Sequence, residues 1–213
     1  MKQRHSFTAL ELVMVITIAA ILLSISIPAF YNISAGRRLT GALTAIAANI
    51  SLARSEAVSS NNYVALIFNP DGDAMRLARL HKITTPAYTF LEWLDGSSWE
   101  KIEEGVVIPA TSDNSNFYEG TSETAPTEIT SVDFSDLGGG ASVSTDRAII
   151  FNPRGQIITK GSEVTPIVIR AAEGTKVPGG SSYVLKKTDT KVTYGRLTVN
   201  PLSCRTEVDY VSE

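Results

Sequence analysis

Cysteine and histidine are nearly absent from this chain, which has one cysteine, Cys204, and two histidines, His5 and His81. A single cysteine excludes an intramolecular disulfide, so the fold must be held together by packing. We expect Cys204 to be a small buried hydrophobic residue, with a reactive thiol or an intermolecular bridge as the alternatives. The chain also lacks the residue clusters that bind metals or form hydrolase sites. We therefore expect no catalytic residues, no metal, no cofactor and no enzymatic activity.

An excess of positive charge is lacking as well. The chain has 19 basic and 22 acidic residues, a net charge of -3. Without Lys2 and Arg4 near the N-terminus, 17 basic and 22 acidic residues remain, a net charge of -5. Nucleic-acid-binding domains are normally basic. The charge balance therefore argues against a general nucleic-acid binder.

Residues 7–30 lack charge except for one carboxylate, that of Glu11. This stretch has the length of about 20 residues that a membrane-spanning helix needs, and its apolar residues surround the whole helix. It is too long for the apolar core of a cleaved secretory signal. A carboxylate inside such a helix is costly and indicates a functional residue. We expect a transmembrane helix over 7–30, and the alternative for Glu11 is an ordinary anchor whose carboxylate reaches the membrane surface.

The position of Glu11 suggests a partner for its charge. A cut between Ser6 and Phe7 would create an amino group one helical turn away, about 6 Å along the helix axis. In a packed assembly of such helices, the Glu11 carboxylate of one subunit would pair with the N-terminal ammonium of its neighbour. Each charge would then compensate the other for the loss of water.

Residues 6–12 and 28–30 resemble the class III signal of type IV pilins and type II secretion pseudopilins. They read Ser6-Phe7-Thr8-Ala9-Leu10-Glu11-Leu12 and Pro28-Ala29-Phe30. The resemblance implies that a prepilin peptidase cuts between Ser6 and Phe7 and methylates the new N-terminus at Phe7. It also implies that Glu11 aids assembly. One departure is Ser6, because the family nearly always has glycine before the cut. Serine is also small, so we still expect processing.

The same resemblance implies a location and a set of partners. Residues 1–6 are expected to form a cytoplasmic leader, and 7–30 a single-pass transmembrane and assembly helix in the inner membrane. The remainder is expected to lie in the periplasm, with extraction of the subunit into a filament. The implied partners are the prepilin peptidase, other pilins or pseudopilins and the lipid of the inner membrane.

Beyond Phe30, apolar residues recur at steps of three and four, which is the pattern of one face of a helix. They are Leu39, Leu43, Ile46, Ile50, Ala53 and Ala57. This period predicts that the helix continues in amphipathic form over 31–62. Pro28 removes a backbone donor and predicts a kink, either a bend or local melting over 24–28.

The end of this helix carries a second family pattern. The segment Leu52-Ala53-Arg54-Ser55-Glu56-Ala57-Val58, followed by Asn61, resembles the helix end of the GspH/FimT group of minor pseudopilins and pilins. From the local sequence alone, we expect Arg54 and Glu56 to lie on a solvated helix face. The resemblance covers the first sixty residues well and the remainder loosely.

Residues 63–213 show short β-type runs separated by turn residues, which is typical of an antiparallel sheet or sandwich. The predicted strands are 63–68, 74–80, 89–94, 101–108, 147–151, 156–159, 167–170, 183–186 and 192–199. The sequence therefore predicts a pilin-like α+β fold, with a long N-terminal helix packed on an antiparallel β-sheet or β-sandwich domain. Residues 111–146 are rich in serine, threonine, glycine and aspartate, and predict a long loop.

The turn between the first two predicted strands contains Asn69, Asp71 and Asp73. Oxygen-bearing side chains at alternate positions are typical of calcium ligands. The loop lacks a downstream bidentate glutamate, and Asn, Pro, Asp and Gly are ordinary turn-forming residues. We expect a turn.

The sequence predicts a minor pseudopilin or pilin, a structural subunit of a type II secretion pseudopilus or a type IV pilus. The alternative is a DNA-binding minor pilin of a DNA-uptake pilus. In FimT-like proteins that activity is associated with a basic C-terminal Gly-Arg-x-Arg pattern, of which 195–198 keeps only the first half. The residues that would form a modest basic patch are Lys186, Lys187, Lys191, Arg196 and Arg205.

Overall fold

The computed structural model describes residues 9–84, 87–109, 118–119, 129–137, 143–145, 147–159, 166–177, 183–188 and 190–212. Within helix α1, the side chains of 25–36 lie outside this description. The chain divides into two compact units, Met1–Arg37 and Arg38–Glu213.

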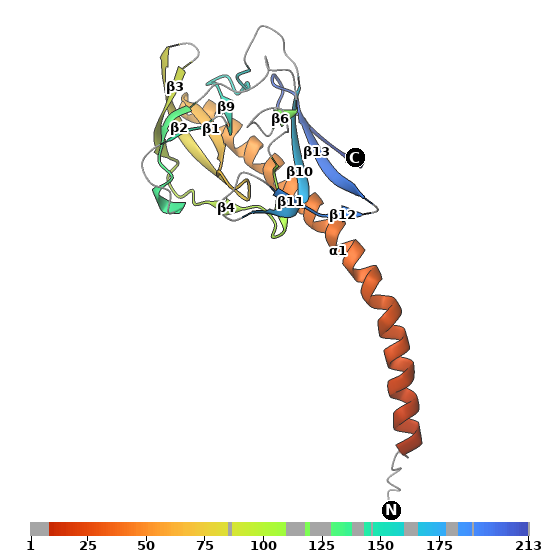
Figure 1. Ribbon diagram of the computed structural model, residues 1–213. Helices are drawn as coiled ribbons and strands as arrows, with labels where there is room; N and C mark the ends of the chain where they lie inside the picture. The colour runs from red at the N-terminus through yellow and green to blue at the C-terminus, as the bar shows by residue number, and fades with distance from the viewer. Residues whose placement is uncertain are drawn as a thin grey trace, which may run out of the picture. The chain divides into compact units, whose positions relative to one another are not determined.

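Helix α1 runs from Ala9 to Ser60, a length of 52 residues (Figure 1). The helix continues without interruption through Pro28, so the predicted local melting over 24–28 is absent. A bend at Pro28 stays a prediction. Asn61 has a φ of 53° and adopts the left-handed conformation that commonly follows a helix end. The helix therefore ends at Ser60, two residues before the predicted limit of 62.

The first of two seven-stranded sheets, sheet A, has the order β8-β7-β3-β2-β1-β9, with β4 paired to β2 (Figure 1). Its pairs are antiparallel except for β3 and β7, which are parallel. The strands are β1 (Tyr63–Phe68), β2 (Ala74–Thr84), β3 (Ala87–Trp93), β4 (Glu100–Lys101), β7 (Ile129–Val132), β8 (Val143–Thr145) and β9 (Ala148–Phe151).

The second sheet, sheet B, has the order β11-β10-β13-β12, with β14 paired to β13 and both β5 and β6 paired to β10. All these pairs are antiparallel. The strands are β5 (Val106–Val107), β6 (Tyr118–Glu119), β10 (Ile167–Lys176), β11 (Tyr183–Leu185), β12 (Lys187–Thr188), β13 (Lys191–Val199) and β14 (Thr206–Ser212). The α+β class with mostly antiparallel sheets is thus confirmed.

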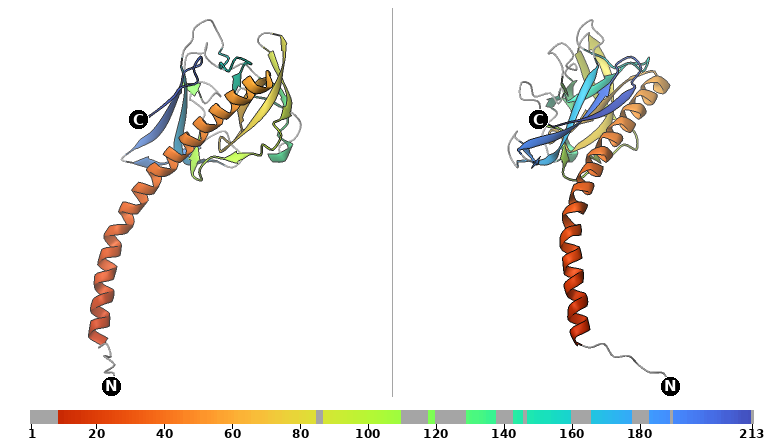
Figure 2. Two further views of the ribbon diagram at one scale, coloured as in Figure 1. Left: turned by 180° about the vertical axis from the view of Figure 1, so that it is seen from behind. Right: turned by 90° about the vertical axis from the view of Figure 1, so that its right-hand side faces the viewer.

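The main core lies where the second half of α1, residues 38–60, packs against both sheets (Figure 2). All six apolar residues that define the predicted helix face are buried, at most 4% exposed. They share one cluster with Leu66 of sheet A and with Ile169 and Leu197 of sheet B. The helix approaches β13 so closely that a Cβ on Gly195 would lie 2.6 Å from the Leu43 side chain.

A second core covers the other face of sheet A and contains no residue of α1. It includes Ile67 and Tyr88, and a chain of ring contacts runs along it from Phe90 through Trp93 and Trp99 to Phe134. Because both faces of sheet A are covered, five of the six β1 residues are buried, without the alternation of a half-exposed strand.

The segment predicted as a loop over 111–146 contains structure in its described parts. They include β6, β7, the short 3-10 helix η1 (Ser135–Leu137) and β8. The prediction of a continuous loop was wrong at these positions, because Ile129, Val132 and Phe134 are buried in the second core and attach the segment to sheet A.

Two strand predictions were also wrong. Residues 101–108 form β4 in sheet A and β5 in sheet B, and the chain changes sheets at Gly105, whose φ is 79°. Residues 156–159 form no strand, although Ile157 makes a single bridge to Phe151. Two backbone hydrogen bonds flank this bridge, from the Asn152 N–H to the Gln156 carbonyl and from the Ile158 N–H to the Ile150 carbonyl, so the segment contacts β9 but pairs with it at this one bridge only. Strand β14 was not predicted at all.

Candidate functional site

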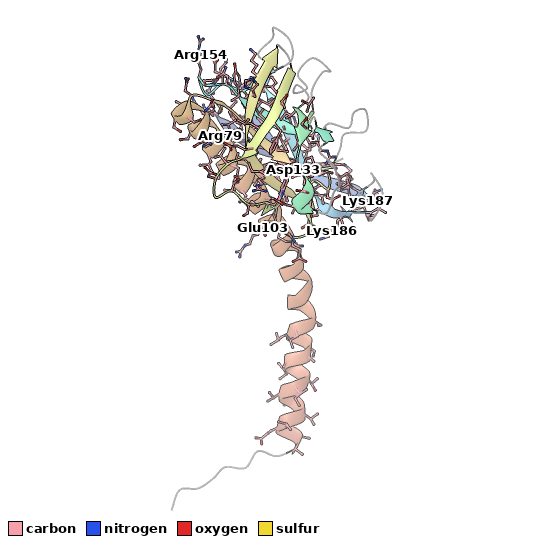
Figure 3. The ribbon with its side chains drawn as sticks, turned by 90° about the vertical axis from the view of Figure 1, so that its left-hand side faces the viewer. Arg79, Glu103, Asp133, Arg154, Lys186 and Lys187 are labelled. Atoms are coloured by element: carbon pink, nitrogen blue, oxygen red, sulfur yellow. The ribbon has the colours of Figure 1, made fainter. Side chains whose placement is uncertain are left out.

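The first half of α1, residues 9–24, exposes apolar side chains on every side (Figure 3). The exposed fractions lie between 50% and 80% for Leu10, Leu12, Val13, Met14, Val15, Ile16, Ile18, Ile21, Leu22 and Leu23. Five of these residues, 12 to 16, are consecutive and so point in all directions around the axis. A helix that is apolar all round is normally covered by lipid or by other helices. This surface is the candidate functional site.

Glu11 is the acidic residue in the first turn of α1, and its side chain is exposed. The helix dipole is positive at this end and favours a carboxylate there. Ser6 and Phe7, the predicted processing residues, lie outside the described residues, as does the side chain of Pro28. No helix in the described part of the chain is both long and apolar enough to cross a membrane.

Arg54 and Glu56, which we expected on a solvated face, instead attach α1 to the β-domain. Arg54 Nη1 donates a hydrogen bond to the carbonyl oxygen of Ser203. Glu56 accepts one at 3.2 Å from Arg79 of β2, and Arg79 also donates to Glu92 of β3 at 2.9 Å. Figure 3 labels Arg79. Hydrogen bonds to Glu92 and then Glu56 raise the pKa of Arg79 above its ordinary value. The expectation failed because the partners are distant in sequence.

The same end of the helix shields Cys204, which is 7% exposed. Its thiol donates to the carbonyl of Gly155 at 3.3 Å, and burial raises the pKa of the thiol, partly opposed by Arg54. Gly155 has a φ of 72°, and a Cβ there would lie 2.9 Å from Val58 of α1. Cys204 is therefore a buried residue, as predicted, and lies at the helix–domain junction.

The turn considered as a calcium site is closed by its own side chains. Asn69 Oδ1 accepts the backbone N–H groups of Asp73 and Ala74, both at 3.0 Å. Asn69 Nδ2 donates to Asp73 Oδ1 at 2.6 Å. Among the described residues, no three histidine, cysteine or acidic side chains come together as metal ligands. These contacts support the interpretation of this segment as a turn.

Two residues of the considered basic patch have acidic partners. Lys186 Nζ lies 3.0 Å from a carboxylate oxygen of Glu173, and a guanidinium nitrogen of Arg196 lies 3.6 Å from a carboxylate oxygen of Asp209. Lys186 and its neighbour Lys187 are labelled in Figure 3. Pairing reduces the positive charge that such a patch offers to a phosphate backbone. The described geometry does not favour the DNA-binding alternative.

Comparison with known protein families identifies the fold region of this chain. The family model for the type II transport protein GspH matches residues 42–186, which is more than half of the chain. The matched range begins in the second half of α1 and includes all of sheet A. Neither the curated proteins nor the solved structures contain a match to the chain.

Proposed function

We propose that this chain, which belongs to the GspH family of type II transport proteins, is a minor subunit of a type II secretion pseudopilus. The family consists of structural pseudopilins and not of enzymes. The subunit assembles through the first half of α1. The observation that carries the proposal is the exposed apolar surface around residues 9–24, with one carboxylate in the first turn. Such a surface needs a covering of lipid or of other helices.

Before assembly, residues 7–30 hold the subunit in the inner membrane, with the β-domain in the periplasm. A prepilin peptidase removes residues 1–6 and methylates Phe7. During assembly the helix leaves the lipid and packs against the helices of neighbouring pseudopilins. The exposed apolar side chains support both environments, because lipid and a helical bundle accept the same surface.

Glu11 would supply the specific contact in this bundle. Its carboxylate pairs with the ammonium group of Phe7 in the neighbouring subunit. Breaking a buried ion pair by removing one partner costs about 3 to 5 kcal/mol, because the other charge is left without compensation. The Glu11 ion pair therefore favours subunits that have been cut before Phe7. It also favours neighbouring helices that are shifted by about one helical turn along their axis.

The cut can be tested by the intact mass of the protein purified from membranes. The expected mass lacks Met1 to Ser6 and includes one added methyl group. The variant Ser6→Gly restores the common family residue and should give the same product. A wild-type chain that keeps its first six residues, while Ser6→Gly loses them, would contradict processing after Ser6.

Assembly can be tested with Glu11→Gln, which keeps the shape of the side chain and removes its charge. We expect loss of the subunit from the pseudopilus and loss of secretion, while the β-domain stays folded. Glu104→Gln changes an exposed carboxylate of the β-domain and is the matched control. Unchanged assembly and secretion in Glu11→Gln would contradict the proposal. If piliation fails instead of secretion, the subunit serves a type IV pilus.

A further inference from the structure

Strand β14 forms one edge of sheet B and pairs, among the described strands, with β13 alone. It is the darkest blue strand and lies at the outer edge of its sheet in Figures 1 and 2. The pairing with β13 is continuous over all seven residues of β14. The strand contains no proline and no bulge, two of the devices that hinder pairing at sheet edges, and its charged residues are Glu207 and Asp209. β14 therefore presents a straight edge.

The backbone groups that point out from this edge can be identified from the turn before it. Asn200 N–H donates to the Arg205 carbonyl at 3.0 Å, so these residues are a hydrogen-bonded pair. Such pairs alternate with non-hydrogen-bonded pairs along an antiparallel ladder. Leu197 and Val208 are consequently a non-hydrogen-bonded pair. Val208, and Tyr210 two residues later, therefore direct their N–H and C=O groups away from β13.

One face of β14 is apolar. Val208 lies opposite the buried Leu197, and Tyr210 shares this face, which is directed toward α1. The Tyr210 hydroxyl lies 2.7 Å from the Thr40 hydroxyl of α1. Val208 and Tyr210 are nevertheless 42% and 51% exposed. The edge thus has unburied apolar surface beside its outward backbone groups.

The other face of β14 carries the exposed Glu207 and Asp209 and the half-buried Val211, and Arg196 of β13, 3.6 Å from Asp209, compensates part of its charge. Antiparallel pairing of two β14 strands about Val208 would place Glu207 of one copy opposite Asp209 of the other. Pairing about Asp209 would place two aspartates opposite each other. Like charges directly opposite destabilise a sheet. The charge pattern therefore disfavours these two registers of a second copy, and it favours a strand with basic residues at the positions opposite Glu207 and Asp209.

We propose that the edge of β14 that no described strand covers accepts an extended segment of another protein in which apolar residues alternate with lysine or arginine. The segment adds one strand to sheet B through the outward N–H and C=O groups of Val208 and Tyr210. Its apolar side chains lie beside these two residues, and its basic side chains lie beside Glu207 and Asp209. This surface is separate from the first half of α1, so the proposal does not rest on assembly through the helix.

The probe is a fluorescent peptide with blocked ends, Lys-Val-Lys-Tyr-Lys-Val-Lys, titrated with the full chain in detergent and followed by anisotropy. We expect it to bind at least about tenfold more tightly than Glu-Val-Glu-Tyr-Glu-Val-Glu, because several cross-strand charge pairs change sign together. Equal affinity for the two peptides, or binding of neither, would overturn the proposal.

Backbone methylation of the peptide tests the strand pairing itself. Residues opposite Val208 and Tyr210 direct their amides toward β14, whereas their neighbours direct theirs away. N-methylation of the valine and tyrosine amides should therefore weaken binding at least about tenfold, and N-methylation of the lysine amides by about twofold or less. Equal effects of the two methylation patterns would show that the peptide does not bind as a strand.

Two variants test the edge from the side of the protein. Glu207→Lys together with Asp209→Lys should reverse the preference, so that the acidic peptide binds more tightly. Val208→Pro removes one outward N–H and no bond to β13, and should weaken binding of the basic peptide. Unchanged peptide preference in the double lysine variant would overturn the proposal. Sedimentation tests the alternative partner. If the wild type sediments as a dimer and Val208→Pro does not, the strand that pairs with β14 comes from a second copy of the chain and the proposal is overturned.

Discussion

The two halves of α1 are both rich in apolar residues, and they place these residues in opposite surroundings. In the first half, Leu12 and Ile16 are 58% and 59% exposed. In the second half, Leu43 and Ile46 are fully buried, while polar residues such as Thr44 are exposed. Apolar residues on one face predict burial within the same domain. Apolar residues on every face predict burial against other molecules. The contrast between the two halves can be tested by truncating the same type of side chain in each.

The largest expected effect comes from truncating the same residue type in each half. Ile46→Ala should lower the free energy of unfolding of the β-domain by about 3 kcal/mol, because it opens a cavity in the main core. Ile16→Ala should leave that free energy unchanged. Urea unfolding of the full chain in detergent, followed by the fluorescence of Trp93 and Trp99, measures both. Equal losses in the two variants would break the contrast.

A smaller effect is expected where α1 meets sheet B. Gly195→Ala would place a Cβ 2.6 Å from Leu43 and 3.1 Å from Leu39, both buried, and should destabilise the domain by about 2 kcal/mol through overpacking. Gly41→Ala is the matched control on the helix itself. Its Cβ would meet the Glu103 side chain at 3.1 Å, and that exposed chain end can move aside.

Gly41→Ala should therefore gain up to about 1 kcal/mol from its better helix propensity. The same urea titration distinguishes the two glycines. A stable Gly195→Ala variant would mean that the second half of α1 lies farther from β13 in solution than in the structure.

The smallest effect concerns the second core, to which neither half of α1 contributes. Burial, and secondarily Tyr63, raises the pKa of Tyr88 to about 12, while an unfolded tyrosine titrates near pH 10. The neutral hydroxyl therefore contributes stability that is fully present below about pH 10 and is lost as the pH rises toward 12. The urea midpoint of Tyr88→Phe should fall less between pH 9 and pH 11 than that of the wild type. Identical pH dependence in both proteins would contradict the burial of Tyr88.

Much of the helix and its buried face could be predicted from the sequence. Steps of three and four from Leu39 to Ala57 are typical of a helix with one covered face, and all six residues on that face are buried. The hairpin of β1 and β2 could be predicted from the turn that begins at Asn69. These signals are local, so no knowledge of distant contacts was needed.

The remainder depended on contacts between distant residues. Arg54 and Glu56 have the composition of a solvated face, and their partners Ser203 and Arg79 lie 149 and 23 residues away. Strand β14 was not predicted, although it pairs with β13 along its whole length. The alternation of Glu207 and Asp209 with Val208 and Tyr210 was the signal that could have revealed it.

The candidate site itself followed from composition. The missing charge over residues 7–30 drew attention to the first half of α1, and the structure exposes the apolar side chains of 9–24. The roles of Ser6, Phe7 and Pro28 stay predictions. They depend on a peptidase, a membrane and neighbouring subunits, which the sequence of one chain specifies only through family resemblance.

The most direct test of the central claim is the accessibility of the first half of α1 in the assembled protein. Leu22→Cys and Asp95→Cys place thiols at positions that are both exposed in the isolated chain, and the buried Cys204 of the wild type sets the background. In intact membranes, a membrane-impermeant maleimide should label Asp95→Cys and leave Leu22→Cys unlabelled until the protein is denatured. Labelling of Leu22→Cys at the rate of Asp95→Cys before denaturation would contradict the account.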